Sequence, residues 1–158
     1  MSPEIAPLSP AEVLSLLPQR PPFRFVDVVD EIDAERIVAR YRFRRDEFFY
    51  AGHFPGRPVT PGVILIETMA QVGVVALGYY LASLAMPRAE LGNYVALFSE
   101  CEAEFSAPVY PGEEVTIRAE RVYWRSRKLK SRASLHLADG RVAALATVAG
   151  VGVPNGAL

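Results

Sequence analysis

A long apolar run near the middle of the chain constrains its fold most strongly. From Pro61 to Met86 the only ionisable side chains are those of Glu67 and two tyrosines. As a helix, this run is long enough to cross a bilayer. A membrane span would place the Glu67 carboxylate in lipid at a high cost, and would leave the amphipathic remainder of the chain without a core. We therefore expect a helix buried in protein and no membrane span, with Thr60 as its cap and Pro87 just beyond its end.

The segments on either side of this run have the alternation typical of β-strands. Arginine and apolar side chains alternate between Arg36 and Arg45, and Asp139-Gly140 is typical of a tight hairpin turn. A Ser-x-x-Glu capping box predicts a short helix from Ser9 to Leu17. An antiparallel sheet curled around one apolar helix satisfies this order, which predicts the α+β class. We expect a single domain over residues 1–158, with residues 1–8 as a loose tail. The expected strands are 23–32, 36–45, 94–105, 114–124, 128–138 and 141–151.

The composition excludes several classes of protein. A formal net charge of −1 gives no support for nucleic-acid binding. The two histidines and the single cysteine form no metal-ligand spacing, and the chain has no glycine-rich nucleotide motif and no Gly-x-Ser-x-Gly elbow. With one cysteine, no intrachain disulfide can form. We expect Cys101 to be a small buried residue of a cytoplasmic protein that carries no signal peptide.

Two histidines are available for acid–base chemistry, and their surroundings distinguish them. His136 lies within an alternating segment and is expected to be structural or exposed. His53 lies in a loop, residues 46–60, which is rich in glycine and proline and leads into the apolar helix. Functional side chains concentrate on ordered loops, so His53 is the candidate general base.

Glu67 is the only carboxylate of the apolar run and lies close to two turns from its start. A carboxylate in apolar surroundings must be paired, have a raised pKa, or both, and a core carboxylate bonded to loop amides is the structural alternative. The amides of Gly62 and Val63 lack intrahelical partners and lie at the positive end of the helix dipole. A base, an acid and an oxyanion site suit proton abstraction beside a thioester carbonyl. Spacing alone does not show that they meet.

Three motifs carry a resemblance to a known family. The stretch Gly52–Val63, continued by Ile66–Gln71, resembles the signature of 3-hydroxyacyl-acyl-carrier-protein dehydratases of the FabZ type. Leu17–Phe23 is similar to the opening motif of that family, and Ala107–Glu113 to a later turn. The resemblance runs from about Leu16 to Val151, which is nearly the whole chain.

This resemblance implies a hot-dog fold and a defined reaction. Water would be removed from a (3R)-hydroxyacyl chain on acyl carrier protein to give the trans-2-enoyl form, in fatty-acid or related lipid or polyketide biosynthesis. His53 of one subunit of a homodimer would take the α-proton, Glu67 of the other would assist departure of the hydroxyl, and the Gly62 amide would polarise the carbonyl. A hexamer of three dimers is implied, with no cofactor beyond the phosphopantetheine arm of the substrate. A related dehydratase-isomerase has aspartate at the position of Glu67, so glutamate favours dehydration alone.

The chain departs from the pattern of that family in its charges. Gln19 stands where histidine is usual, and Ser99–Phe105 is acidic where lysine and arginine are typical. The acidic segment puts the usual carrier-docking surface in doubt and suggests a divergent member. A basic cluster could instead receive the acidic carrier or its phosphopantetheine phosphate, with an ordinary solvated strand as the alternative. The members of the cluster are Arg125, Arg127, Lys128, Lys130 and Arg132.

Two other functions are compatible with the same fold. A hot-dog acyl thioesterase would release a free thiol, but the pair of His53 and Glu67 argues against it. A non-catalytic acyl-carrier-binding subunit is suggested by the acidic segment around Glu102. Three apolar side chains of the helix could line an acyl tunnel, with plain core as the alternative. They are Met69, Val72 and Leu77.

Overall fold

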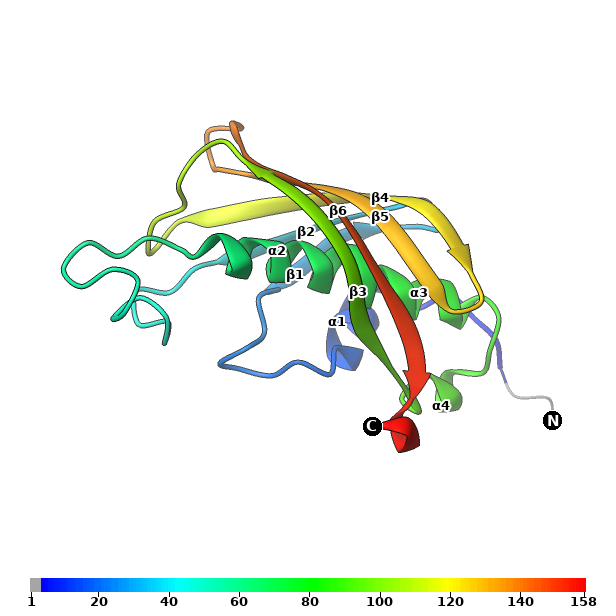
Figure 1. Cartoon of the computed structure of the whole chain (residues 1–158). Coiled ribbons are helices and arrows are strands. Elements are labelled where there is room, and N and C mark those ends of the chain that lie inside the picture. Colours follow the sequence, from blue (N-terminus) through cyan, green and yellow to red (C-terminus); the bar gives the residue numbers. More distant parts are fainter. Residues whose placement is uncertain (1–3) are drawn as a thin grey trace.

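A six-stranded antiparallel sheet and one long central helix make up the computed structural model, which describes residues 4–158 (Figure 1). The strand order is β1-β2-β4-β5-β6-β3, and each neighbouring pair is antiparallel. The expected α+β class and hot-dog architecture are confirmed. The helical elements are α1 (Pro10–Leu16), α2 (Gly62–Ala70), η1 (Gln71–Ala76), α3 (Leu77–Ser83), α4 (Arg88–Leu91) and η2 (Asn155–Ala157). The strands are β1 (Val28–Ile32), β2 (Arg36–Arg42), β3 (Tyr94–Phe105), β4 (Glu114–Arg125), β5 (Lys128–His136) and β6 (Val142–Pro154).

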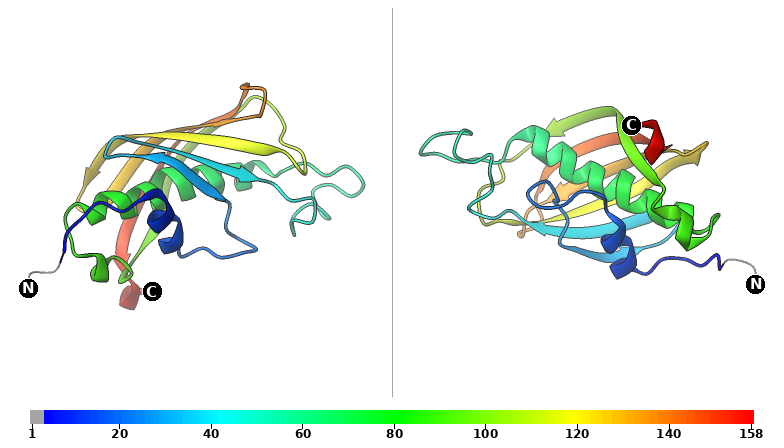
Figure 2. Two further views of the ribbon diagram at one scale, coloured as in Figure 1. Left: turned by 180° about the vertical axis from the view of Figure 1, so that it is seen from behind. Right: turned by 90° about the horizontal axis from the view of Figure 1, so that it is seen from below.

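The central helix lies along the concave face of the sheet, which curls around it (Figure 2). It runs through α2, the π-helical segment η1 and α3 without interruption. Gly73 in η1 allows a close approach, because a Cβ there would lie 3.1 Å from the Cβ of Ala119 on β4. The Ser131 hydroxyl on β5 donates to the Gly73 carbonyl at 2.6 Å. The π-helical segment therefore lies where the sheet contacts the helix backbone directly.

The length and hydropathy of the central helix would also suit a membrane span. In the described structure, however, 72% of its most apolar window is buried inside the protein. The helix packs against β4, β5, β6 and the N-terminal segment, and most of its apolar side chains belong to one continuous core. The prediction of a buried central helix is therefore confirmed.

Gly150 on β6 is a position where the packing of helix and sheet leaves no room for a side chain. A Cβ there would lie 2.6 Å from Val74 Cγ1 and 2.9 Å from the carbonyl oxygen of Leu97. We expect Gly150→Ala to lower the free energy of unfolding by about 1–3 kcal/mol, because helix or strand must move. Denaturant unfolding measures this. Gly92→Ala is the control, since no atom lies within 4 Å of its added Cβ, and an equal loss in both variants would contradict the packing argument.

Three local predictions were wrong. Thr60 does not cap the central helix, because its hydroxyl bonds to that of Tyr50 at 2.7 Å, and the helix starts at α2 without a side-chain cap. Cys101 is exposed on β3 rather than buried. The first strand, β1, is shorter than predicted, because the Phe25 N–H donates to the Gln71 side chain at 2.7 Å instead of to another strand.

The N-terminal segment is fixed to the core by helix α1 and by Leu8, which precedes the N-cap residue Ser9. The predicted capping box of Ser9 and Glu12 is present, and α1 ends at Leu16. Of the tail predicted at residues 1–8, residues 1–3 lie outside the described residues. At its other end, Leu8 is buried and its N–H donates to Ser83 Oγ at 3.3 Å. The tail is therefore held against the end of α3 at residue 8.

Candidate active site

His53 lies in the loop between β2 and α2, and one of its ring nitrogens is engaged by the backbone. Its Nδ1 is 2.8 Å from the carbonyl oxygen of Val59. A carbonyl only accepts hydrogen bonds, so Nδ1 carries the hydrogen and the lone pair of Nε2 is free to take a proton. The Val59 N–H donates back to the His53 carbonyl at 3.0 Å, and the ring stacks on Phe54 with 4.1 Å between centroids. His53 thus has the orientation that a general base needs.

The base of this loop is held by buried polar contacts, one of them to the β3–β4 connection. The Tyr50 hydroxyl bonds to Thr60 Oγ1, and the Thr60 N–H donates to the Val109 carbonyl at 2.8 Å. Burial raises the pKa of Tyr50 to about 12, although its hydrogen bond with Thr60 opposes the shift, so this hydroxyl stays neutral. On the strand side, the Tyr41 hydroxyl donates to Glu47 at 2.5 Å. The loop is therefore held at both ends, while its tip carries His53.

Glu67 lies on the second turn of the central helix and is partly buried. Its Oε1 accepts a hydrogen bond from Gln71 Nε2 at 2.9 Å. Burial raises the pKa of Glu67, and the bond from Gln71 offsets part of the shift. Among residues 4–158, no cationic side chain pairs with this carboxylate. Glu67 therefore keeps its proton to a higher pH than an exposed glutamate does.

Gln71 determines where the Glu67 carboxylate lies. Its side chain is fully buried, donates to the Phe23 carbonyl at 2.9 Å and accepts from the Phe25 N–H. The remaining donor hydrogen is directed at Glu67. The i, i+4 spacing of Gln71 from Glu67 permits this bond, but the sequence alone does not distinguish it from a polar side chain that only costs the helix stability.

The raised pKa of Glu67 predicts a pH-dependent effect on stability. The folded state holds the Glu67 proton over a wider pH range than the unfolded chain, so stability falls as pH rises from the unfolded towards the folded pKa. Glu67→Gln removes this loss. The Tm of the variant minus that of the wild type should therefore increase as the pH rises above the ordinary pKa of glutamate, about 4.3. Calorimetry at several pH values measures this difference, with the exposed Glu31→Gln as control. A difference independent of pH would contradict the prediction.

Gly62 and Val63 provide the free amides that the sequence predicted at the start of α2. Neither N–H has a hydrogen-bond acceptor within the described part of the chain. A Cβ at Gly62 would lie 3.1 Å from the ring of Phe105, so glycine allows this edge of β3 to reach the helix start. The Val63 side chain is 71% exposed. The helix start therefore presents two backbone donors beside an exposed apolar face.

A single chain does not bring the two candidate acid–base residues into contact. No hydrogen bond joins His53 to Glu67 among residues 4–158, and the loop that carries His53 projects away from the start of α2 (Figure 1). The neighbouring edge strand, β3, has no further strand beside it in the described structure. Its surface includes three exposed apolar side chains, Leu97, Phe98 and Phe105.

The predicted basic cluster divides into a hairpin tip and a row along β5. Ser126 and Arg127 form the two-residue β4–β5 turn, both with left-handed backbone at φ 49° and 59°. The Arg125 guanidinium lies 5.0 Å above the ring of Tyr123, and that of Arg127 lies 5.0 Å above the ring of Tyr94. Lys128, Lys130 and Arg132 alternate with buried residues and therefore share the outer face of β5.

The acidic segment of β3 faces this basic row across β6. Glu100 and Lys130 are both paired in register with Ala149, a small residue. The Lys128 ammonium lies 2.5 Å from the Glu100 carboxylate, and this contact lowers the pKa of Glu100. Glu100 therefore neutralises part of the positive charge of the basic row on β5. Within the described residues, no acidic side chain pairs with Arg125 or Arg127.

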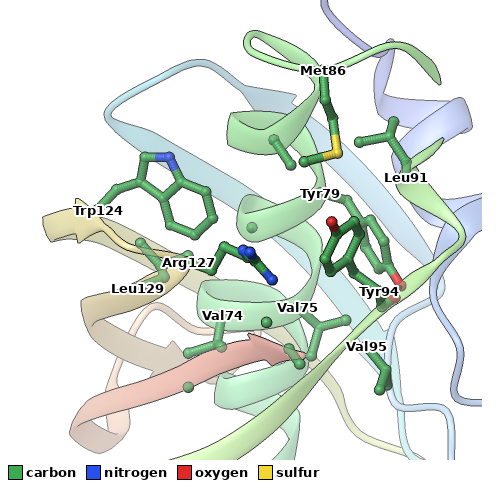
Figure 3. A pocket seen from close by; sticks show the side chains of 15 residues that line it. Val74, Val75, Tyr79, Met86, Leu91, Tyr94, Val95, Trp124, Arg127 and Leu129 are labelled. Carbon is green, nitrogen blue, oxygen red and sulfur yellow. Dashed lines mark hydrogen bonds between the residues drawn. The ribbon is translucent and has the colours of Figure 1, made fainter. Parts of the chain in front are cut away.

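A cavity of about 530 Å³, counting its open mouth, lies between the C-terminal half of the central helix and the ends of β3 to β6 (Figure 3). Its lining is apolar and aromatic apart from Arg127. The three residues predicted to line an acyl tunnel do not reach it: all are fully buried in the core. These are Met69, Val72 and Leu77. Val74, Val75, Gly78 and Ala82 line the cavity from the helix instead.

The remaining candidates have structural surroundings. His136 lies 2.8 Å from the Ser134 hydroxyl on β5, as expected for a structural or exposed histidine. Across residues 4–158, no three His, Cys, Asp or Glu side chains are placed to hold a metal ion.

Comparison with known proteins connects this geometry to one family. The family model described as "FabA-like domain" matches residues 17–147. The chain belongs to the FabA-like family. Curated relatives include the 3-hydroxyacyl-acyl-carrier-protein dehydratase FabZ of Geotalea uraniireducens, 38% identical over 84% of this chain and 88% of the relative. That of Thermus thermophilus is 37% identical over 87% and 92%, respectively. The family resemblance expected from the motifs is therefore confirmed.

Solved structures support the fold of this FabA-like protein. A thioesterase from Haemophilus influenzae has a TM-score of 0.66 at 11% identity and covers 95% of this chain and 94% of its own. A hypothetical thioesterase with coenzyme A from Streptococcus pneumoniae has a TM-score of 0.57 at 13% identity, over 80% and 84%. At these identities the likeness establishes the shared fold and nothing about the reaction.

Proposed function

We propose that this protein is a 3-hydroxyacyl-acyl-carrier-protein dehydratase that converts a (3R)-hydroxyacyl chain to the trans-2-enoyl form. The observation that carries the proposal is the presence of both a histidine with a free Nε2 and a glutamic acid whose pKa is raised by burial. Elimination of water needs one group of each kind. The relatives named FabZ support the same reaction, in fatty-acid or related lipid or polyketide biosynthesis.

The first half of the reaction breaks the bond between the α-carbon and its hydrogen. His53 Nε2 accepts the proton, and the electron pair moves towards the thioester carbonyl. Negative charge then develops on the carbonyl oxygen, where the Gly62 and Val63 amides are the available donors. Because Val59 already holds Nδ1, the imidazolium formed keeps its orientation.

The second half breaks the bond between the β-carbon and its oxygen. Glu67 gives its proton to the departing hydroxyl, which leaves as water, and the electron pair returns to form the double bond. His53 ends with one proton more and Glu67 with one fewer, so both are restored by exchange with solvent. The reaction involves no net oxidation or reduction, and we propose no cofactor beyond the phosphopantetheine arm of the substrate.

The active site in this proposal is shared between two subunits. No hydrogen bond joins His53 to Glu67 among residues 4–158, while the free edge of β3 and the exposed face of α2 offer a surface for a second copy. Such a copy would lay the loop that carries His53 across the partner's Glu67. Three such dimers would form the proposed hexamer.

The carrier protein is acidic in this proposal and meets the basic side chains at the β4–β5 hairpin. Arg125 and Arg127 are the strongest candidates, because Glu100 already pairs with Lys128. Lys130 and Arg132 extend the same surface along β5. We propose that the enzyme acts in the cytoplasm.

The test is a mass-spectrometric assay on 3-hydroxyacyl carrier protein of several chain lengths. We expect the purified protein to remove the mass of one water while the acyl chain stays attached. Release of free thiol to a thiol-reactive dye would replace the proposal with a thioesterase. Binding of the acyl carrier without any mass change would replace it with a non-catalytic subunit.

A further inference from the structure

Two buried hydroxyl groups flank the loop that carries His53. Tyr50 and Thr60 stand immediately before and after residues 51–59, and each is only 5% exposed. Most of the loop between them is exposed, and the His53 ring stacks on Phe54, which is itself exposed. Packing against the core therefore does not fix the imidazole, and its orientation depends on the hydrogen bonds at the base of the loop.

The acceptor of the His53 ring belongs to a peptide unit that is bonded on its other side as well. The Val59 carbonyl, 2.8 Å from His53 Nδ1, and the Thr60 N–H lie in the same rigid peptide plane. The Thr60 N–H donates to the Val109 carbonyl at 2.8 Å. The direction of the Val59 carbonyl is thus fixed from the opposite side, and two hydrogen bonds in series through one peptide strengthen each other.

The Thr60 side chain holds the same peptide from a third direction. Its hydroxyl lies 2.7 Å from the Tyr50 hydroxyl in a buried environment, where a hydroxyl without a partner would be costly. The Tyr50 carbonyl also accepts the His53 N–H, at 3.3 Å. Tyr50 therefore contacts the backbone of His53 at one end of the loop and the side chain of Thr60 at the other. Loss of the hydroxyl bond would remove a restraint on the peptide that the imidazole follows.

We propose that Tyr50 and Thr60 are positioning residues for His53. Their bond keeps the Val59 carbonyl directed at Nδ1, which selects the tautomer with its hydrogen on Nδ1 and a lone pair on Nε2. A neutral imidazole without this acceptor populates both tautomers, and only one of them can take a proton through Nε2. The part in turnover rests on the proposed function, whereas the tautomer belongs to the resting chain and is measured without substrate.

Ring ¹⁵N NMR of the full-length protein with labelled histidine measures the tautomer, because a ring nitrogen that carries hydrogen and one with a lone pair differ in shift. His136→Ala as background leaves His53 as the only labelled ring. At about pH 9, above the usual pKa of an imidazole, we expect the Nδ1–H form. Tyr50→Phe and Thr60→Val should each give a mixture of tautomers and lower kcat by about tenfold, with KM within about twofold.

Thr60→Ser is the conservative control, because it retains the hydroxyl that bonds to Tyr50. It should keep the Nδ1–H tautomer and a kcat within about twofold of wild type. Tyr41→Phe is the control for lost stability, since it removes another tyrosine hydroxyl at this loop, whose partner is Glu47 at 2.5 Å. It should lower the Tm without changing the tautomer. The combined Tyr50→Phe and Thr60→Val variant should lose no more kcat than either alone, because all three lack the same bond.

Three results would overturn the proposal. One is a ring that keeps the Nδ1–H tautomer in Tyr50→Phe and Thr60→Val proteins that circular dichroism shows to be folded. Another is an equal change of tautomer in Thr60→Ser or Tyr41→Phe, as expected from a general loosening of the loop. The third is an unchanged kcat in an active protein whose tautomer has changed. A chain that removes water from no substrate, but whose tautomer responds as expected, would contradict the proposed function alone.

Discussion

Replacement of His53 by alanine is expected to lower the rate of dehydration by about 10²- to 10⁴-fold. The imidazole is the base in the proposed reaction, and the hydrogen bond from its Nδ1 to Val59 leaves Nε2 as the atom that takes the α-proton. Without it, the free amides of the helix start and the acid at Glu67 still remain, so residual activity should exceed that of the reaction in water. Single-turnover kinetics on 3-hydroxyacyl carrier protein measure the change.

His136→Ala is the matched control, because it removes the only other histidine of the chain. That ring bonds to Ser134 on the sheet, away from the loop of His53, so turnover should stay within about twofold of wild type. Circular dichroism and thermal unfolding of both variants would show whether the fold is intact. Unchanged turnover in a folded His53→Ala protein would remove the dehydratase proposal.

The sequence predicted the elements of this fold well wherever hydrophobic periodicity dominates. The long strands β3 to β6 have the alternation of strands, and the central helix has a continuous apolar run, so their positions followed from the pattern. The prediction from periodicity was wrong where a side chain bonds to a distant backbone group. The N-terminal strand was predicted too long because the bond from Phe25 to Gln71 spans 46 positions, and periodicity carries no information about such contacts.

The candidate site was predicted in its residue types but not in its arrangement. His53, Glu67 and the amides of Gly62 and Val63 could be selected because each is unusual for its local surroundings. Gln71, the partner of Glu67, could not be selected in this way. A glutamine in an apolar run is equally well interpreted as a polar side chain whose burial lowers the stability of the helix. The mouth of the cavity was also missed, because the left-handed turn that aims Arg127 has no glycine or asparagine to indicate it.

A mixture of two inactive variants is expected to regain activity if the active site is shared between subunits. His53→Ala chains still carry Glu67, and Glu67→Gln chains still carry His53. When both are co-expressed at equal levels and assemble at random, about a quarter of the sites combine an intact His53 with an intact Glu67. The same fraction holds for a dimer and for a hexamer of dimers. Activity of the mixture should therefore approach about a quarter of wild type, while each variant alone stays near background.

This recovery distinguishes the shared site from a closure of the loop within one chain. If the loop of His53 folded back onto Glu67 of its own chain, every site in the mixture would lack one of the two groups and activity would stay at the level of the separate variants. A doubly substituted chain, His53→Ala with Glu67→Gln, mixed with wild type is the control. For a shared site, random mixing leaves about a quarter of the sites intact, whereas a site within one chain leaves about half. Recovery of both chains through an affinity tag on only one of them shows that the chains mix. Absence of recovery despite demonstrated mixing would reject the shared site and would require the loop to move, because no hydrogen bond joins the two residues among residues 4–158.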